Sequence, residues 1–368
     1  MEPMPRLTVC GAGAAGLAIA GDCALKGLEV TLFELPTLAG KLAAARAAGG
    51  IEVTADSETT AGRTGFAPLA GVTDDAAEAV AGADVVMITV PAMYHDAFMD
   101  AVAPHLRDGQ IVLFNTGYWA SLRQARRLAG ALPDVTLAES NIMPYICQPR
   151  GDAINIGRFK RHFCVAAFPG ERSAVTYDVL RHIYTQYDRA ATVLDTNIAA
   201  AGNPPIHVTL TIPIAGLYFD RYMGGKFYQD TTIPGARLVT AFDAERERLA
   251  AHLGSESFED QVSFDRRSYL YEGEDLVQML RSSPHADWFA TAAYLEQVGS
   301  EDIIYSYVPM VRLGEALGID LPVTRAMVEV MGVMLQRDYW AEGLDLADLG
   351  LDGLDLEGVR RFVVSGRR

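Results

Sequence analysis

A glycine-rich turn between an apolar segment and a helix-like run constrains this chain more than any other feature. The turn is Gly11-Ala-Gly13-Ala-Ala-Gly16, it follows the strand-like Leu7-Thr-Val-Cys10, and a second strand-like segment ends on Glu34. The first glycine permits a tight turn, the second lets the backbone approach a pyrophosphate, and the third lets the following helix pack on a sheet. This spacing in this context predicts a dinucleotide-binding turn rather than a structural glycine turn.

The residues around the turn indicate how a dinucleotide is held. A helix that begins near Ala14 presents free N–H groups and its positive dipole end to the phosphates. Glu34 lies close to the expected distance downstream for bonding a ribose 2′-hydroxyl, and its charge would repel a 2′-phosphate. We therefore expect Gly11, Gly13, Ala14, Gly16 and Glu34 to bind NAD in preference to NADP, although NADP is not excluded.

The N-terminal half alternates between strand-like and helix-like segments. Strands are expected at 7–10, 29–34, 50–54, 83–91, 110–117 and 135–139, with helices at 36–48, 74–81, 93–106 and 120–132. This alternation predicts an α/β, doubly wound parallel sheet of the Rossmann type, whose ligands lie at the carboxyl ends of the strands. At those ends we expect Val90, Pro91 and Thr116 to contact the cofactor and Asn141 to lie near the substrate.

The pattern changes beyond residue 191, where helical periodicity dominates. Helices are expected at 243–253, 276–281, 310–317 and 323–334. We therefore expect a Rossmann domain over 1–190 and an all-helical substrate or catalytic domain over 191–368, joined between Thr185 and Asn203.

Composition narrows the class of partner. The 368 residues carry 31 basic and 47 acidic side chains, a net charge of −16. Such a balance argues against a nucleic-acid or anionic-membrane surface. The four scattered cysteines show no metal-ligand spacing, no apolar run is long enough to span a bilayer, and no signal-peptide pattern opens the chain. We expect a cytoplasmic protein with free thiols and no metal.

One histidine stands apart as a candidate acid/base residue. His207 lies in Asn203-Pro-Pro-Ile-His207, just past the expected domain junction, whereas the other six lie among charged or apolar neighbours in helices or strands. A nicotinamide site needs a proton donor or acceptor beside the carbon that receives the hydride. From the residues alone, a histidine that is satisfied in the core is the competing interpretation.

At this point the chain resembles the octopine/nopaline (opine) dehydrogenase family, nearly end to end. The resemblance rests on several weak motifs in the right order. They are an Asn-x-x-x-His motif (Asn203, His207), Asp243-Ala-Glu-Arg246, a Glu-Asp pair before a Val-Pro (Glu301-Asp302, Val308-Pro309), and the late segments Arg337-Asp-Tyr-Trp-Ala-Glu-Gly343 and Leu346-Ala-Asp-Leu-Gly-Leu351.

The resemblance implies a reaction and roles for particular residues. Family members condense the amine of an amino acid with a 2-oxo acid and reduce the resulting imine with NAD(P)H. His207 would be the acid/base, Asp302 its orienting carboxylate, and Asn203 would lie near the substrate. From the residues alone, Ser300-Glu-Asp302 is also typical of the start of a helix. The partners implied are small-molecule amines and 2-oxo acids, and assembly as a homodimer is left open.

The chain departs from the family at residues that would grip substrate carboxylates. Gln297 stands where the family often has an arginine, and Cys147-Gln148 where it often has Cys-Arg, with Arg150 nearby. Arg150, Arg266, Arg267 and Arg312 are candidates to replace the lost charges. Two other functions stay open: a related two-domain 2-oxo acid or glycerol-3-phosphate-type reductase, and a dinucleotide-binding paralogue without turnover. Such reductases look as if they rely on a lysine near the cofactor, and none of the four lysines of this chain comes directly after the Asn115 loop.

Overall fold

A computed structural model describes residues 4–56, 63–219, 224–284 and 286–368 of the protein. The chain divides into two compact units, the first comprising Met1–Val193 with Val364–Gly366 and the second Leu194–Val363 with Arg367–Arg368. Among the described residues, no helix is both long and apolar enough to cross a membrane.

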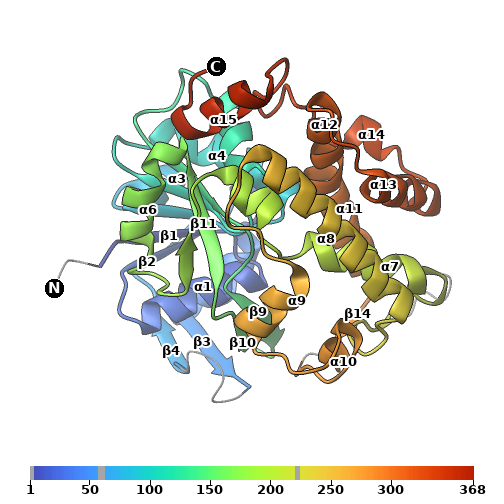
Figure 1. Cartoon of the computed structure of the whole chain (residues 1–368). Coiled ribbons are helices and arrows are strands. Elements are labelled where there is room, and N and C mark those ends of the chain that lie inside the picture. Colours follow the sequence, from blue (N-terminus) through green and yellow to red (C-terminus); the bar gives the residue numbers. More distant parts are fainter. Residues whose placement is uncertain (1–3, 57–62, 220–223, 285) are drawn as a thin grey trace. The chain divides into compact units, whose positions relative to one another are not determined.

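The first unit is built on an eight-stranded sheet with helices packed against it (Figure 1). Its strand order is β12-β11-β8-β7-β6-β1-β2-β5, and all neighbours are parallel except the β8–β11 pair. The strands are β1 (Leu7–Cys10), β2 (Val30–Phe33), β5 (Gly71–Thr73), β6 (Val85–Ile88), β7 (Ile111–Phe114), β8 (Thr136–Ser140), β11 (Phe163–Phe168) and β12 (Tyr187–Arg189). The predicted doubly wound Rossmann sheet is confirmed.

The strand order reverses beside β1, which pairs with β2 on one side and with β6 on the other. All four residues of β1 and of β6 are buried, as expected for parallel strands that are covered on both faces. The glycine turn leaves β1 at this point. The reversal therefore places the turn where open α/β sheets bind their ligands.

A second, four-stranded sheet completes the first unit. Its order is β4-β3-β10-β9, with β3 (Gly50–Ala55), β4 (Gly65–Pro68), β9 (Tyr145–Arg150) and β10 (Ala153–Phe159). The strand expected at 50–54 exists as β3, but it pairs with β4 and β10 rather than with the main sheet. The short β5 takes the third position beside β2 instead.

The helices of the first unit largely follow the predicted ranges. They are α1 (Ala14–Leu25), η1 (Pro36–Leu42), α2 (Ala43–Ala48), α3 (Ala76–Val80), η2 (Ala92–Tyr94), α4 (His95–Val102), η3 (Ala103–His105), α5 (Ala120–Arg127), η4 (Gly170–Arg172) and α6 (Ser173–Leu180). Small residues let α1 lie close to its neighbours: a Cβ on Gly21 would come within 2.5 Å of Val53 on β3.

The second unit is mostly helical. Its helices are α7 (Pro204–Tyr218), α8 (Ile233–Leu253), α9 (Gln261–Phe264), α10 (Leu276–Arg281), α11 (Ala292–Asp302), α12 (Val308–Ala316), α13 (Pro322–Leu335) and α14 (Tyr339–Glu342), and most of α15 (Leu356–Ser365) also belongs to it. A two-residue ladder, β13 (Gly225–Lys226) with β14 (Phe289–Ala290), is its β-structure within the described residues. Three π-helical turns occur in this unit: η5 (Asp195–Ala199), η6 (Asp265–Tyr269) and η7 (Ile303–Tyr307).

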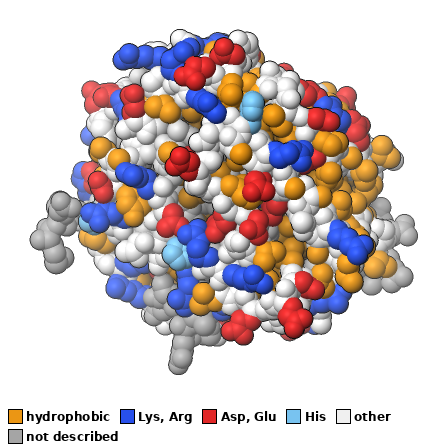
Figure 2. All heavy atoms as spheres, in the orientation of Figure 1, with side chains coloured by type: hydrophobic (Ala, Val, Ile, Leu, Met, Phe, Trp, Pro, Cys, Tyr) orange, Lys and Arg blue, Asp and Glu red, His pale blue; other side chains and the backbone are white. Residues whose placement is uncertain are grey.

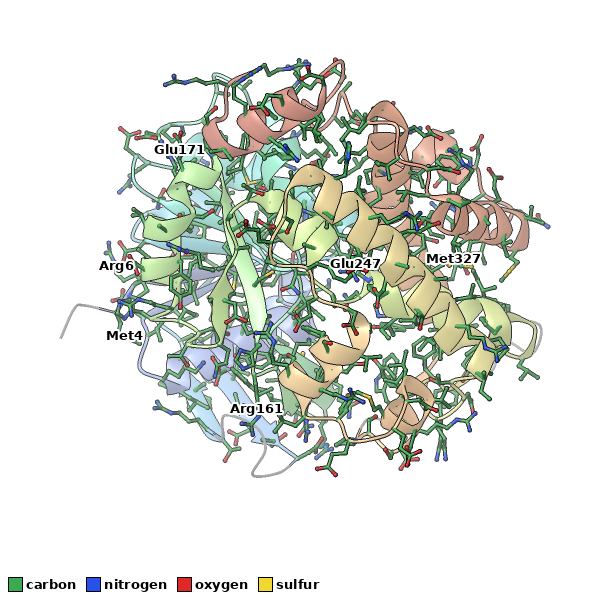
Figure 3. All side chains as sticks on the ribbon, viewed as in Figure 1. Met4, Arg6, Arg161, Glu171, Glu247 and Met327 are labelled. Carbon is green, nitrogen blue, oxygen red and sulfur yellow. The ribbon has the colours of Figure 1, made fainter. Side chains whose placement is uncertain are left out.

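The Asp243-Ala-Glu-Arg246 motif lies on α8 and organises the packing of this unit. The buried Glu245 carboxylate accepts the backbone N–H groups of Val323 and Thr324, 2.8 Å each, and so caps the start of α13. Arg246, also buried, bonds to Asp243 and donates to the carbonyls of Ile198 (3.1 Å) and Ala199 (3.0 Å). The next residue, Glu247, is exposed (Figure 3). The motif therefore ties three segments together.

Candidate active site

The glycine turn has the geometry that a dinucleotide site requires. Gly11 adopts φ +108°, a conformation that side chains rarely allow, and a Cβ there would lie 2.5 Å from Val90. A Cβ on Gly16 would lie only 1.7 Å from the carbonyl oxygen of Gly11. The turn and the start of α1 are thus in contact, and both positions need glycine.

Gly13 and the start of α1 offer the surface that a pyrophosphate needs. Gly13 is exposed, caps the helix without a side-chain hydrogen bond, and has no atom within 4 Å of the place where a Cβ would stand. The half-buried Ala14 is the first helical residue. Unblocked N–H groups at a helix start bind phosphate oxygens, so these residues fit a dinucleotide.

Glu34 follows the last residue of β2 and its side chain is 1% exposed. Its Oε2 accepts the N–H of Ala12 at 3.0 Å and its Oε1 accepts the N–H of Leu35 at 2.9 Å. The half-exposed Lys41 ammonium lies 3.9 Å from Oε2. Each carboxylate oxygen has a second lone pair for a ribose hydroxyl. Glu34 therefore both braces the glycine turn and carries a negative charge beside it.

The loop after β6 lies against the glycine turn. The Thr89 hydroxyl donates to the carbonyl of Cys10 at 2.9 Å, and Val90 and Pro91 follow it, both half-buried. The Val90 carbonyl lies 3.2 Å from Nε2 of His95, a fully buried residue that the sequence analysis assigned no role. His95 therefore holds the loop that we expect to meet the cofactor.

The loop after β7 holds the half-buried Thr116 next to a buried polar group. The Asn115 side-chain carbonyl accepts the hydroxyl of Ser140, and Asn115 is buried. Asn141, just past β8, is buried as well, and its side-chain carbonyl accepts the N–H of Cys164 at 2.8 Å. This hydrogen bond joins the end of β8 to β11, so the Asn141 side chain contributes to the sheet rather than to an open site.

The second unit brings His207 and Asp302 together. Nδ1 of His207 lies 2.9 Å from Oδ2 of Asp302, and the exposed fractions of the two side chains are 12% and 0%. A carboxylate accepts the Nδ1–H, which leaves Nε2 as the ring nitrogen that can exchange a proton. This arrangement is typical of a histidine acid/base with an orienting acid.

Asp302 is the last residue of α11, and the π-turn η7 follows it directly. The alternative interpretation, in which Ser300-Glu-Asp302 begins a helix, is wrong. The helix begins with Thr291, whose hydroxyl accepts the N–H of Tyr294 at 3.1 Å. Asp302 therefore points into the unit at a helix end and is free of a capping role.

The remaining predicted residues lie in different surroundings. Asn203 is the N-cap residue of α7, makes no side-chain capping bond, and stands one helical turn before His207. Gln297 is exposed on α11. Arg150 is exposed at the end of β9 and forms an ion pair with Asp56 at 2.8 Å, so it belongs to the second sheet.

Parts of both units match known protein families. Residues 189–335 match the α-helical domain of NAD/NADP octopine/nopaline dehydrogenases, and residues 48–129 match the NADPH-binding domain of acetohydroxy acid isomeroreductases. An opine dehydrogenase of Arthrobacter sp. (strain 1C) is 26% identical over 367 residues, covering 96% of this chain and 98% of the relative. The protein ocs of Agrobacterium tumefaciens (strain Ach5) is 24% identical, with 97% and 99% covered.

The solved structure of an octopine dehydrogenase with NADH and agmatine has the same fold. Its TM-score is 0.78 at 16% identity, with 99% of each chain covered. Fold and matches together define an oxidoreductase that uses a nicotinamide dinucleotide. More specifically, the chain is similar to opine dehydrogenases over nearly its whole length.

Proposed function

We propose that this protein catalyses the NADH-dependent reductive condensation of an amine, such as an amino acid, with a 2-oxo acid through an imine. The buried His207–Asp302 pair is the observation that carries this proposal. Related solved structures are described with NADH and agmatine, with NADH and L-arginine, and with NADH and pyruvate. When bound, the dinucleotide supplies the hydride.

His207 supplies the proton transfers that such a condensation needs. The amine must lose a proton to attack the carbonyl carbon, and the hydroxyl of the resulting adduct must gain one to leave as water. Nε2 of His207 is the ring nitrogen left for both steps, because Nδ1 faces Asp302. Asp302, fully buried, accepts the Nδ1–H and so fixes the orientation of the ring.

The cofactor would be held by the residues of the first unit that surround the glycine turn. They are Gly11, Gly13, Ala14, Gly16, Glu34, Val90, Pro91 and Thr116. We propose that NADH is preferred over NADPH because the Glu34 carboxylate would meet a 2′-phosphate as a like charge.

Substitution of the pair tests the mechanism. His207→Ala should lower kcat by about two to four orders of magnitude without weakening NADH binding, as expected for loss of a general acid/base. Asp302→Asn should act in the same direction, and the double variant should be far less than additive because the pair acts as a unit. His105→Ala, at an exposed histidine, is the matched control. Wild-type turnover in His207→Ala would remove this residue from the mechanism.

A substrate matrix separates this function from the alternatives. Amines crossed with 2-oxo acids should give NADH oxidation only when both are present. Oxidation with an oxo acid alone would instead indicate a 2-oxo acid reductase. Dinucleotide binding without turnover in any combination would favour a non-catalytic paralogue.

A further inference from the structure

A buried tyrosine links the two segments that carry the His–Asp pair. Tyr307 is the last residue of η7, five residues after Asp302, and it is 0% exposed. Its hydroxyl donates to the carbonyl oxygen of Pro204 at 2.8 Å. Pro204 is the first residue of α7, and His207 follows three residues later. The bond therefore reaches the same helical turn that holds the imidazole.

Two hydrogen bonds thus connect the same pair of segments. One runs from His207 to Asp302 (2.9 Å) and the other from Tyr307 to Pro204 (2.8 Å). A single hydrogen bond between the two segments would still let the first turn of α7 rotate about that bond. The second bond restrains that movement. It therefore restrains the direction in which Nε2 of His207 points.

The surroundings keep the Tyr307 hydroxyl in place as a donor. The ring of Phe242, from α8, stacks on the ring of Tyr307 with centroids 4.5 Å apart and planes at 21°. Burial, together with the charges of Asp302 and Asp243, raises the pKa of Tyr307 well above its usual range, and the Arg246 guanidinium opposes this only in part. The phenol is therefore protonated whenever the enzyme could be active.

We propose that Tyr307 is a positioning residue for the acid/base chemistry, which fixes the His207 imidazole against Asp302 by anchoring the carbonyl of Pro204. The inference rests on the proposed function of the pair. It explains why a tyrosine with no expected contact to substrate is buried between α7 and α8. The π-turn η7 connects Asp302, which orients the imidazole of His207, to Tyr307, which anchors the helix that carries His207.

Tyr307→Phe tests this because it removes one oxygen and keeps the ring. We expect kcat to fall about tenfold to a hundredfold, with the KM for NADH unchanged, since small misplacements of a catalytic group have effects of that size. The loss should fall on kcat rather than on KM, because the Tyr307 hydroxyl acts on the direction of the imidazole and not on ligand binding.

The matched control is Tyr339→Phe. Tyr339 is also buried in the second unit, and its hydroxyl bonds to Ser300 (2.7 Å) rather than to α7. This control should lose a comparable buried hydrogen bond with a much smaller fall in kcat. A second variant, Phe242→Leu, leaves the Tyr307 hydroxyl but removes its stacking partner, and should lower kcat by less than Tyr307→Phe does.

A spectroscopic measurement separates failure of this inference from failure of the proposed function. The proton between Nδ1 of His207 and Oδ2 of Asp302 should give a far-downfield resonance, assigned by its loss in His207→Gln. We expect this signal to broaden or move upfield in Tyr307→Phe and to persist in Tyr339→Phe. If Tyr307→Phe and Tyr339→Phe behave alike in both the resonance and kcat, Tyr307 is only structural. The resonance answers this question even if His207→Ala keeps full turnover.

Discussion

Both oxygens of the Glu34 carboxylate already accept a backbone N–H, from Ala12 and from Leu35. A substitution that removes the whole side chain therefore disturbs the glycine turn as well as the charge. Glu34→Gln keeps the length and one acceptor oxygen but removes the charge, whereas Glu34→Ser removes both. Comparing the two variants separates the effect of losing the hydrogen bonds to the glycine turn from the effect of losing the charge that distinguishes NADH from NADPH.

We expect the wild-type enzyme to prefer NADH, because a like charge beside a desolvated 2′-phosphate disfavours NADPH. Glu34→Gln should narrow the ratio of kcat/KM between the cofactors mainly by improving NADPH. Glu34→Ser should narrow or reverse the ratio and also weaken NADH binding. Steady-state kinetics with both cofactors measures this, and a wild-type preference for NADPH would contradict the assignment.

His95 gives the stability of the first unit a defined pH dependence. Burial, followed by the nearby Arg123 guanidinium, lowers the pKa of His95 to about 3, while the bond to the Val90 carbonyl opposes the shift. Unfolding restores a pKa of about 6.5. Between these values the unfolded chain binds a proton that the folded chain does not. This group therefore lowers stability as the pH falls, by about 1.4 kcal/mol per pH unit at most.

We therefore expect acidification from about pH 6 to pH 4 to destabilise the wild type more than His95→Gln, because glutamine keeps a donor for Val90 without titrating. Denaturant unfolding at several pH values measures the difference between the two proteins. A difference that stays constant with pH would show that His95 does not titrate in this way.

At the scale of elements, α11 carries both the orienting Asp302 and the exposed Gln297, where the family often has an arginine. The arginines considered as replacements have other partners here. Arg150 pairs with Asp56, Arg267 with Glu259, Arg266 donates to the Gly273 carbonyl, and Arg312 donates to the carbonyls of Trp340, Gly343 and Leu344. A substrate carboxylate that met Gln297 in place of an arginine would lack a charge-assisted bond worth about 1.5–3 kcal/mol, roughly tenfold to a hundredfold in affinity.

We accordingly expect weak activity with pyruvate plus a common amino acid, and better activity with a partner that is bulkier or lacks one carboxylate. Gln297→Arg should lower the KM for pyruvate-like oxo acids if position 297 lines the site. Glu296→Gln, at the neighbouring exposed residue, makes the same change in net charge and controls for it. Saturation of the wild type at micromolar pyruvate, or an unmoved KM in Gln297→Arg, would refute the idea.

The elements also show what the sequence could and could not reveal. The Rossmann strands were predictable because buried parallel strands are continuous apolar runs. The helix α7 was not predicted, because Pro204–Tyr218 is apolar on most sides, contains Pro213, and shows no helical stripe. The pairing of β3 with β10 in a second sheet depends on contacts about a hundred residues apart. Local patterns do not encode such contacts.

For the candidate site, motifs singled out His207 and Asp302, yet the contact between their side chains could not be derived from the sequence. They stand 95 residues apart in the chain and meet through the packing of α7 against α11. Tyr307 and His95 were missed for a related reason. Each side chain bonds to a backbone carbonyl. Every residue has such a group, so no sequence pattern identifies the partner.

At the scale of the whole molecule, basic and acidic side chains are interspersed over the face drawn in Figure 2. The acidic side chains behind the net charge of −16 are therefore not gathered into one area of that face. The chain passes between its two units at Val193–Leu194, at Val363–Val364 and at Gly366–Arg367. These crossings are the positions at which relative movement of the units would have to be absorbed.

The hinge expected between Thr185 and Asn203 can be narrowed from contacts inside the second unit. The Asp195 carboxylate accepts the hydroxyl of Ser255 at 2.5 Å, and Arg246 holds the carbonyls of Ile198 and Ala199. Residues from Asp195 onward are therefore fixed to the second unit. The change in backbone angles should fall before Asp195, since hinges are a few loop or element-terminal residues that absorb such changes.

We expect the units to close when the cofactor and both substrates are present, because imine reduction must be shielded from water. Small-angle scattering should show a smaller radius of gyration with NADH and both substrates than for the free protein, and NADH alone should give a smaller change or none. His207→Ala, which should bind ligands without turnover, allows the closed state to be measured at equilibrium. A proline at Thr192, before the fixed segment, should slow or limit closure, whereas a proline at the exposed Val175 on α6 should not. An unchanged radius in every ligand state would instead indicate a rigid, preformed arrangement, and the chemistry would then need its water excluded by side chains alone.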